Sequence, residues 1–171
     1  MEHLSATAVV QTVALLGFAV LVFWAGVNDV LTFTVPNRIS IAVALLYPAY
    51  VLSATLPVAW EAALIVALAA FFLGFVLFTS GTWGGGDAKL FAAAALWAGP
   101  EYIVSFTMIT TLAGGVMAIF IWLQHHLPRA HVTGMMLHID TDPDLAKQPM
   151  PYAAAIAVGA LYVAFTLLKV G

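Results

Sequence analysis

Runs of apolar residues long enough to cross a membrane occupy most of this sequence. Of its 171 residues, 64% are hydrophobic and 8% are charged, whereas a soluble domain is about 45–50% apolar and about 25% charged. A soluble domain of this length needs many polar residues, because a small fold exposes a large share of its surface. The composition therefore predicts an integral membrane protein with the lipid bilayer as its solvent.

Proline, glycine and charged residues divide these runs into six stretches, and a helical span needs about 20 mostly apolar residues. The predicted spans are Ala6–Val27, Ile39–Leu56, Ala62–Phe78, Ala88–Gly99, Tyr102–Leu123 and Tyr152–Val170. We expect an all-α, polytopic protein with six transmembrane helices, in which residues 1–171 form a single membrane-embedded domain. The first stretch is too long for a signal peptide and no cation precedes it, so we expect a retained helix.

The few cations predict the orientation of these helices. Arg38 lies in the first connection, Lys89 at the third, and Arg129 and Lys147 in the fifth. The remaining cation, Lys169, is near the C-terminal end. Cytoplasmic loops are enriched in Lys and Arg. We therefore expect both termini outside, and the long polar loop Gln124–Met150 in the cytoplasm.

Charge and cysteine content exclude several functions. The net charge is −3, which does not fit the basic surface of a nucleic-acid-binding protein. The sequence contains no cysteine, so it has no disulfide, no thiolate metal site and no cysteine nucleophile. We expect no nucleic-acid partner.

Two aspartates lie beside predicted helices on the same side of the membrane. Asp29 follows the first span, and Asp87 opens the fourth span after the glycines Gly84, Gly85 and Gly86. Ionisable residues at membrane depth are costly and usually functional. Two neighbouring carboxyl groups can share one proton, so that one activates water while the other protonates a leaving amine. The glycines permit positive φ and a close approach of an extended peptide.

A structural role is the alternative for each aspartate taken singly. Asp87 suits the N-cap of the fourth span, because Asp is favoured at that position. Asp29 suits an interfacial turn that ends at Pro36. Their position on one side of the bilayer, at the two most polar helix ends, favours a shared function.

Three segments resemble the type IV prepilin peptidases, which are membrane aspartic proteases. Gly84–Asp87 looks like the Gly-x-Gly-Asp motif of that family. The stretch from Asp29 to Pro36 and Asn37 resembles its first-aspartate motif, and Pro151–Gly159 is similar to its last helix. The resemblance covers essentially the whole chain, although the basic residues that the family usually has between the first Asp and the Pro are missing here.

The resemblance implies an endopeptidase without a cofactor that removes the leader of pilin-like precursors at the cytoplasmic face of a bacterial or archaeal inner membrane. Asp29 and Asp87 match the catalytic positions, and we expect Gly84, Gly85, Gly86 and Pro36 to contact substrate. The short length is similar to the branch that serves Flp-type (tight-adherence) pili. In this family methyltransferase activity accompanies a domain with Cys-x-x-Cys motifs. The sequence has no cysteine, so methyltransferase activity is not implied. Pilus or secretion assembly components are possible partners.

Two other functions and a metal site remain as alternatives. Asp29 and Asp87 also suit a proton relay in a small ion-coupled carrier, and a non-catalytic assembly subunit is a further interpretation. The long loop contains four histidines and three aspartates: His125, His126, His131, His138, Asp140, Asp142 and Asp144. Their spacing matches neither a calcium loop nor a zincin helix, so we predict a solvated loop and no metal.

Overall fold

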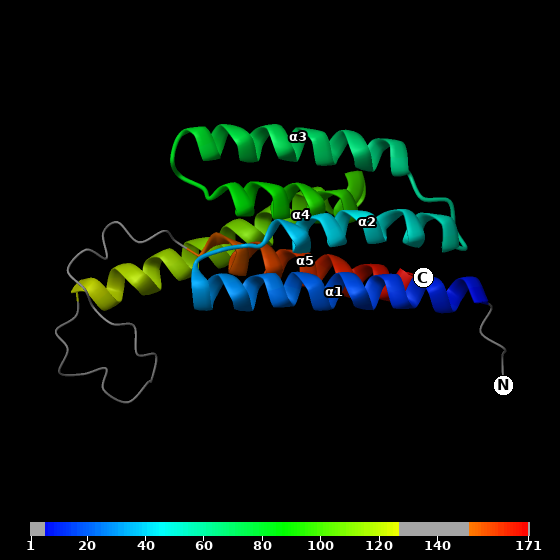
Figure 1. Cartoon of the computed structure of the whole chain (residues 1–171), viewed down its shortest axis with the longest axis horizontal. Coiled ribbons are helices and arrows are strands. Elements are labelled where there is room, and N and C mark those ends of the chain that lie inside the picture. The colour runs from blue at the N-terminus through cyan, green and yellow to red at the C-terminus, as the bar shows by residue number, and fades with distance from the viewer. Residues whose placement is uncertain (1–5, 127–150, 171) are drawn as a thin grey trace, which may run out of the picture.

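A computed structural model describes residues 6–126 and 151–170, and these ranges contain helices and no strand. The helices are α1 (Ala6–Thr32), α2 (Asn37–Ser53), α3 (Trp60–Thr79), α4 (Gly85–His126) and α5 (Tyr152–Val170). They lie side by side as one elongated bundle (Figure 1). The predicted all-α fold class is confirmed for these ranges.

Helix α4 consists of two arms that meet at Gly99. This residue has φ 55° and ψ −170°, and Pro100 follows it. Glycine adopts positive φ without the usual penalty, and proline has no N–H with which to continue a helix. The chain reverses direction here, and the second arm returns toward the end where α4 begins (Figure 1). The break predicted after Gly99 is therefore present.

Within the described ranges, four helices are long and apolar enough to cross a membrane. They are α1, α3, α5 and the Gly85–Leu123 part of α4, whereas α2 is a shorter apolar helix. The number of six membrane crossings stays a prediction, because the two arms of α4 are counted as one span and α2 is not counted. Many large apolar side chains point outward, and Leu45 and Leu52 are 70% and 86% exposed. Such a surface is suited to lipid.

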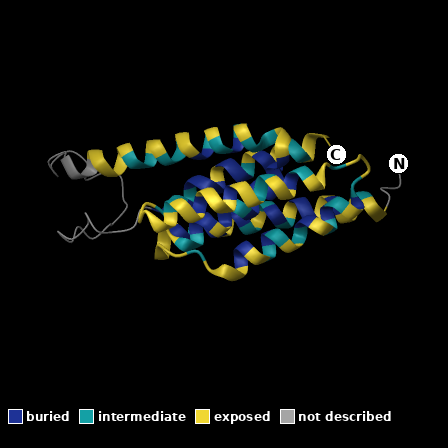
Figure 2. Ribbon diagram, turned by 90° about the horizontal axis from the view of Figure 1, so that it is seen from above, coloured by how far each residue is buried: buried dark blue, intermediate teal, exposed yellow. Residues whose placement is uncertain are grey.

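Small residues let the helices approach closely around a buried centre (Figure 2). A Cβ atom added to Gly26 of α1 would lie 2.8 Å from the Cβ of Ala157 in α5. A Cβ on Gly159 of α5 would lie 2.9 Å from the Phe106 carbonyl oxygen in α4. Small residues at helix interfaces are the usual means of tight packing in membranes. They hold α5 between α1 and the second arm of α4.

The two ends of the bundle hold different connections (Figure 1). One end, which we call the aspartate end, contains the end of α1, the α3–α4 connection and the beginning of α5. The opposite end contains the beginning of α1, the α2–α3 connection, the turn at Gly99 and the end of α5. The end of α1 with Asp29 and the beginning of α4 with Asp87 therefore lie at the same end of the bundle.

Three observed helix boundaries at the aspartate end differ from the predicted ones. Helix α1 continues five residues past Val27, because Asn28 and Thr32 satisfy local backbone groups: Thr32 Oγ1 donates to the Asn28 carbonyl oxygen at 2.8 Å. The first arm of α4 begins at Gly85 instead of Ala88. The second arm runs through His126, into the predicted loop. The rest of that loop, residues 127–150, lies outside the described residues.

Candidate active site

The carboxyl group of Asp29 lies at the N-terminus of α5. Asp29 is in the last turn of α1 and is 3% exposed. Its Oδ2 accepts a hydrogen bond from the Ala153 backbone N–H at 2.8 Å, and the Ala154 N–H lies within reach. The first N–H groups of a helix have no partner within the helix and carry partial positive charge. Asp29 therefore supplies from α1 the cap that α5 lacks in its own sequence.

The carboxyl group of Asp87 folds back over the beginning of its own helix. Asp87 is the third residue of α4 and is 6% exposed. Its Oδ2 accepts the Gly84 N–H at 3.1 Å, while the Gly84 carbonyl oxygen accepts the Ala88 N–H at 3.2 Å. This is the arrangement of an acidic residue in a capping box. The structural alternative is thus partly right: Asp87 caps α4, although from the third position and not from the N-cap.

The two carboxyl groups meet at the Ala153 N–H. This N–H donates to Asp29 and also lies within reach of Asp87, and the two carboxyl groups are close enough to interact electrostatically. Two acids that are 58 positions apart in the sequence are therefore buried neighbours. Such a pair can hold one proton between its members and serve as acid and base together.

The three glycines allow close packing. The positive φ that we predicted for them is not observed. None of them has a positive φ. A Cβ on Gly86 would lie 2.9 Å from the Val35 Cβ and 3.0 Å from the Val35 carbonyl oxygen. A Cβ on Gly85 would lie 3.4 Å from the Phe78 ring, and one on Gly84 would lie 2.9 Å from the Asp87 carboxyl group. The absence of side chains therefore lets the α1–α2 connection rest on the first turn of α4.

The α1–α2 connection brings the Pro-Asn pair to the same place. Phe33 directly follows α1 and has φ 52°, in the left-handed region that is strained for a residue with a side chain. Pro36 precedes α2 and follows Val35, the neighbour of Gly86. Lys89 Nζ donates to Asn37 Oδ1 at 2.9 Å, which joins the beginnings of α2 and α4. Pro36 thus follows directly the residue that packs on the first turn of α4.

Sequence reasoning missed the part that α5 has in this site. Trp83, just before the glycines, packs its ring against Tyr152 at 5.8 Å and against Phe91 at 5.3 Å between ring centroids. These contacts hold the beginning of α5 against the α3–α4 connection. In the sequence, Pro151 indicates where α5 begins, because proline is common at the beginning of a helix.

An open apolar groove of about 300 Å³ runs between α1 and α5 beside Asp29. The α1 side is formed by Phe23, Gly26, Val27, Val30 and Leu31, and the α5 side by Ala154, Ala157, Val158 and Leu161. These positions recur at three- and four-residue intervals, so each helix presents one face to the groove. The lining includes Val30 and Ala154, the sequence neighbours of Asp29 and Ala153.

The His and Asp residues of the long loop, for which a metal site was the alternative, fall mainly outside the described part of the chain. His131, His138 and the three loop aspartates lie there, and His125 and His126 end α4. Among the described residues, no group of three or more His, Asp or Glu side chains is placed to hold a metal ion.

A comparison with known families gives an independent result. The sequence model of the type IV leader peptidase family matches residues 16–119, more than half of the chain. The chain belongs to this family. The matched range includes both aspartates, and membership makes the protein a protease of the prepilin leader peptidase type. No curated protein and no solved structure matches the chain.

Proposed function

We propose that this leader peptidase is an aspartic endopeptidase in which Asp29 and Asp87 are the catalytic residues. The observation that carries the proposal is the convergence of both buried carboxyl groups on the Ala153 N–H. Hydrolysis of a peptide bond needs a base that takes a proton from water and an acid that protonates the leaving amine. Two carboxyl groups that share one proton supply both, and after cleavage the proton has moved from one to the other.

The proposed substrate is a pilin-like precursor, and we take the Flp type as the first candidate. In such a precursor the scissile bond directly precedes a hydrophobic helix. The aspartates lie at one end of the bundle, so a helix anchored at the cleavage site would continue along the bundle. The α1–α5 groove has the required direction and an apolar lining. We place the precursor's helix there, with Pro36 and the three glycines near the peptide backbone.

The same geometry supports six crossings of a bacterial or archaeal inner membrane. The aspartate end would face the cytoplasm, where the leader is presented, and both termini would lie outside. Pilus or secretion assembly proteins are the proposed further partners. Nothing in this proposal requires a cofactor or a methyltransferase domain.

The direct test is co-expression with Flp-type precursors, with mass spectrometry of the pilin. The proposal expects a mass loss equal to the leader, only when the peptidase is present. The rival function, an ion-coupled carrier, needs acids along a path through the membrane. The described acids lie instead at the two ends, Asp29 and Asp87 at one, Glu61 and Glu101 at the other, which favours a reaction at one face.

Filling the groove should impair cleavage of a membrane-inserted precursor. Val158 is 49% exposed on the groove wall, and Leu68 of α3 is 58% exposed outside the groove. We expect Val158→Trp to raise KM for the full precursor at least about tenfold, equivalent to about 1.4 kcal/mol of binding. Leu68→Trp should have little effect. Equal KM values for the two variants would remove the groove from the substrate path.

Cysteine labelling should establish the orientation, since the native chain has no cysteine. Ser80 lies in the α3–α4 connection at the aspartate end, and Thr55 in the α2–α3 connection at the opposite end. In intact cells an impermeant thiol reagent should modify Thr55→Cys and spare Ser80→Cys. Modification of Ser80→Cys alone would invert the proposed orientation.

A further inference from the structure

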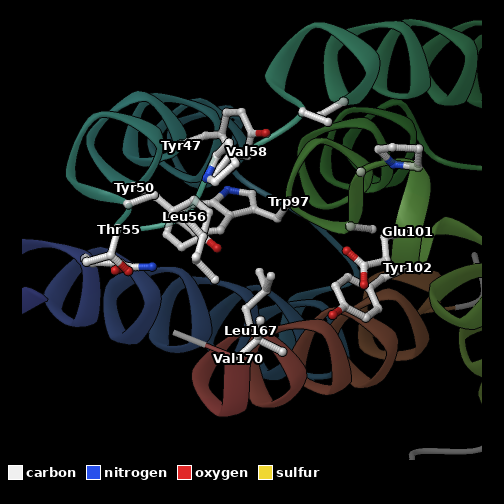
Figure 3. Close-up of a pocket in the computed structure, with 18 residues that line it drawn as sticks. Tyr47, Tyr50, Thr55, Leu56, Val58, Trp97, Glu101, Tyr102, Leu167 and Val170 are labelled. Carbon is white, nitrogen blue, oxygen red and sulfur yellow. The ribbon is translucent and has the colours of Figure 1, made fainter.

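A cavity of about 280 Å³ lies at the end of the bundle opposite the aspartates. Its wall is formed by α1, α2, the α2–α3 connection, the region around Gly99 and the end of α5 (Figure 3). In Figure 3 the ring of Trp97 lies between the two α2 tyrosines, Tyr47 and Tyr50, and the pair Glu101 and Tyr102. The leader peptidase chemistry proposed above makes no use of this cavity.

The aromatic part of the wall is held rigidly. The Trp97 ring stacks on Phe18 with centroids 4.4 Å apart, and its Nε1 donates to the Val43 carbonyl oxygen at 2.9 Å. The ring centroids of Tyr47 and Tyr50 lie 5.6 Å and 5.3 Å from that of Trp97. Both tyrosines are more than nine-tenths buried. The cavity therefore has preformed aromatic surfaces, as ligand sites usually do.

The charge in the cavity is negative. Glu101 is the one charged side chain among its lining residues, all of which the structure describes, and none of them is Lys, Arg or His. The Glu101 carboxyl group hydrogen-bonds with Tyr102 and interacts electrostatically with Tyr50 across the cavity. Lys169 is directed elsewhere, with its Nζ 4.3 Å from the centroid of the Phe165 ring. Glu101 is exposed at the mouth of the cavity, and an anion would meet its carboxylate with no cation among the lining residues to balance it.

We propose that this cavity binds an alkylammonium group. The positive charge would face Glu101, and the methyl or methylene groups around it would contact the rings of Tyr47, Tyr50 and Tyr102. Tyrosine faces attract such cations through their ring quadrupole, more strongly where water is excluded. The group is either the headgroup of a choline or ethanolamine phospholipid or a free amine, because the cavity lies at a bundle end that the membrane surface can reach.

The experiment uses the full-length protein purified in a maltoside detergent, which contains no ammonium group. Thermal unfolding is followed while tetramethylammonium chloride is titrated against sodium chloride at equal ionic strength. We expect a saturable rise of Tm with tetramethylammonium alone. Glu101→Gln should raise the apparent Kd at least about tenfold, whereas Glu61→Gln, which removes an acid at the same end but outside the cavity, should not change it.

Two further variants separate ring contact from a general loss of structure. Tyr102→Phe keeps the ring and should keep the apparent Kd within about threefold, while Tyr102→Leu should weaken binding at least about tenfold. No saturable difference between tetramethylammonium and sodium, or equal effects of Glu101→Gln and Glu61→Gln, would overturn the proposal.

Native mass spectrometry of protein extracted from membranes identifies the source of the group. Retention of an ethanolamine or choline phospholipid that tetramethylammonium displaces would assign the site to lipid. Binding of tetramethylammonium without a retained lipid would assign it to a free amine. Retention of phosphatidylglycerol in preference to both would contradict the cation site.

Discussion

Asp29→Asn and Asp87→Asn should each reduce leader cleavage by about 10³-fold or more. General acid catalysis and general base catalysis each raise a reaction rate by about 10²–10⁴-fold. The two carboxyl groups work as a unit, so removing one of them loses both contributions. Asparagine keeps the size of the side chain and its carbonyl oxygen. It can therefore still accept the hydrogen bond that Ala153 gives to Asp29 or that Gly84 gives to Asp87. Measurement requires initial rates on a purified precursor in detergent or lipid.

The same hydrogen bonds provide the control for this experiment. Because the caps of α4 and α5 are preserved, we expect both Asn variants to accumulate in membranes at the native level and to unfold within a few degrees of the native Tm. Asp29→Ala removes the acceptor from Ala153 and should lower Tm by more than Asp29→Asn does. Substantial cleavage by either Asn variant would show that its carboxyl group is a cap and not a catalyst.

Local sequence patterns predicted most of the architecture because lipid leaves few options for the backbone. Apolar stretches separated by polar or proline-containing segments gave the helices, and Gly99-Pro100 gave the break in α4. Boundaries at the aspartate end were harder to predict. Asn28 and Thr32 are poor signals for a helix interior, yet their mutual hydrogen bonding extends α1 past Asp29.

The candidate site was predictable to the extent that its residues form local motifs. Asp29 and Asp87 were predicted as catalytic candidates, because a carboxylate beside an apolar helix is rare in any sequence. The contact of the Ala153 N–H with Asp29 was not predicted, since every residue except proline has a backbone N–H. This N–H becomes important only because α5 packs on α1. The glycines were predicted to contact substrate, whereas no local pattern indicated that Gly86 packs against Val35, because the two positions are 51 residues apart.

Gly86→Ala should lower leader cleavage by about 10–100-fold while the protein stays folded. The added Cβ would meet Val35 at 2.9 Å on its side chain and 3.0 Å on its carbonyl oxygen. A backbone atom cannot move aside as a flexible side chain does, so the α1–α2 connection must shift away from α4. A misplacement of about 1 Å near the reacting groups is enough for a loss of this size. Gly86→Val should lose more activity than Gly86→Ala.

Gly115→Ala is the matched control, because Gly115 lies in the second arm of the same helix and a Cβ there meets nothing within 4 Å. We expect native cleavage and equal or slightly higher stability from this change, since alanine favours helices over glycine by about 1 kcal/mol. The decisive measurement is kcat on a purified precursor, with Tm recorded for each variant. If Gly86→Ala cleaved at the native rate, the packing of the α1–α2 connection on α4 would have no part in positioning Asp87 against Asp29.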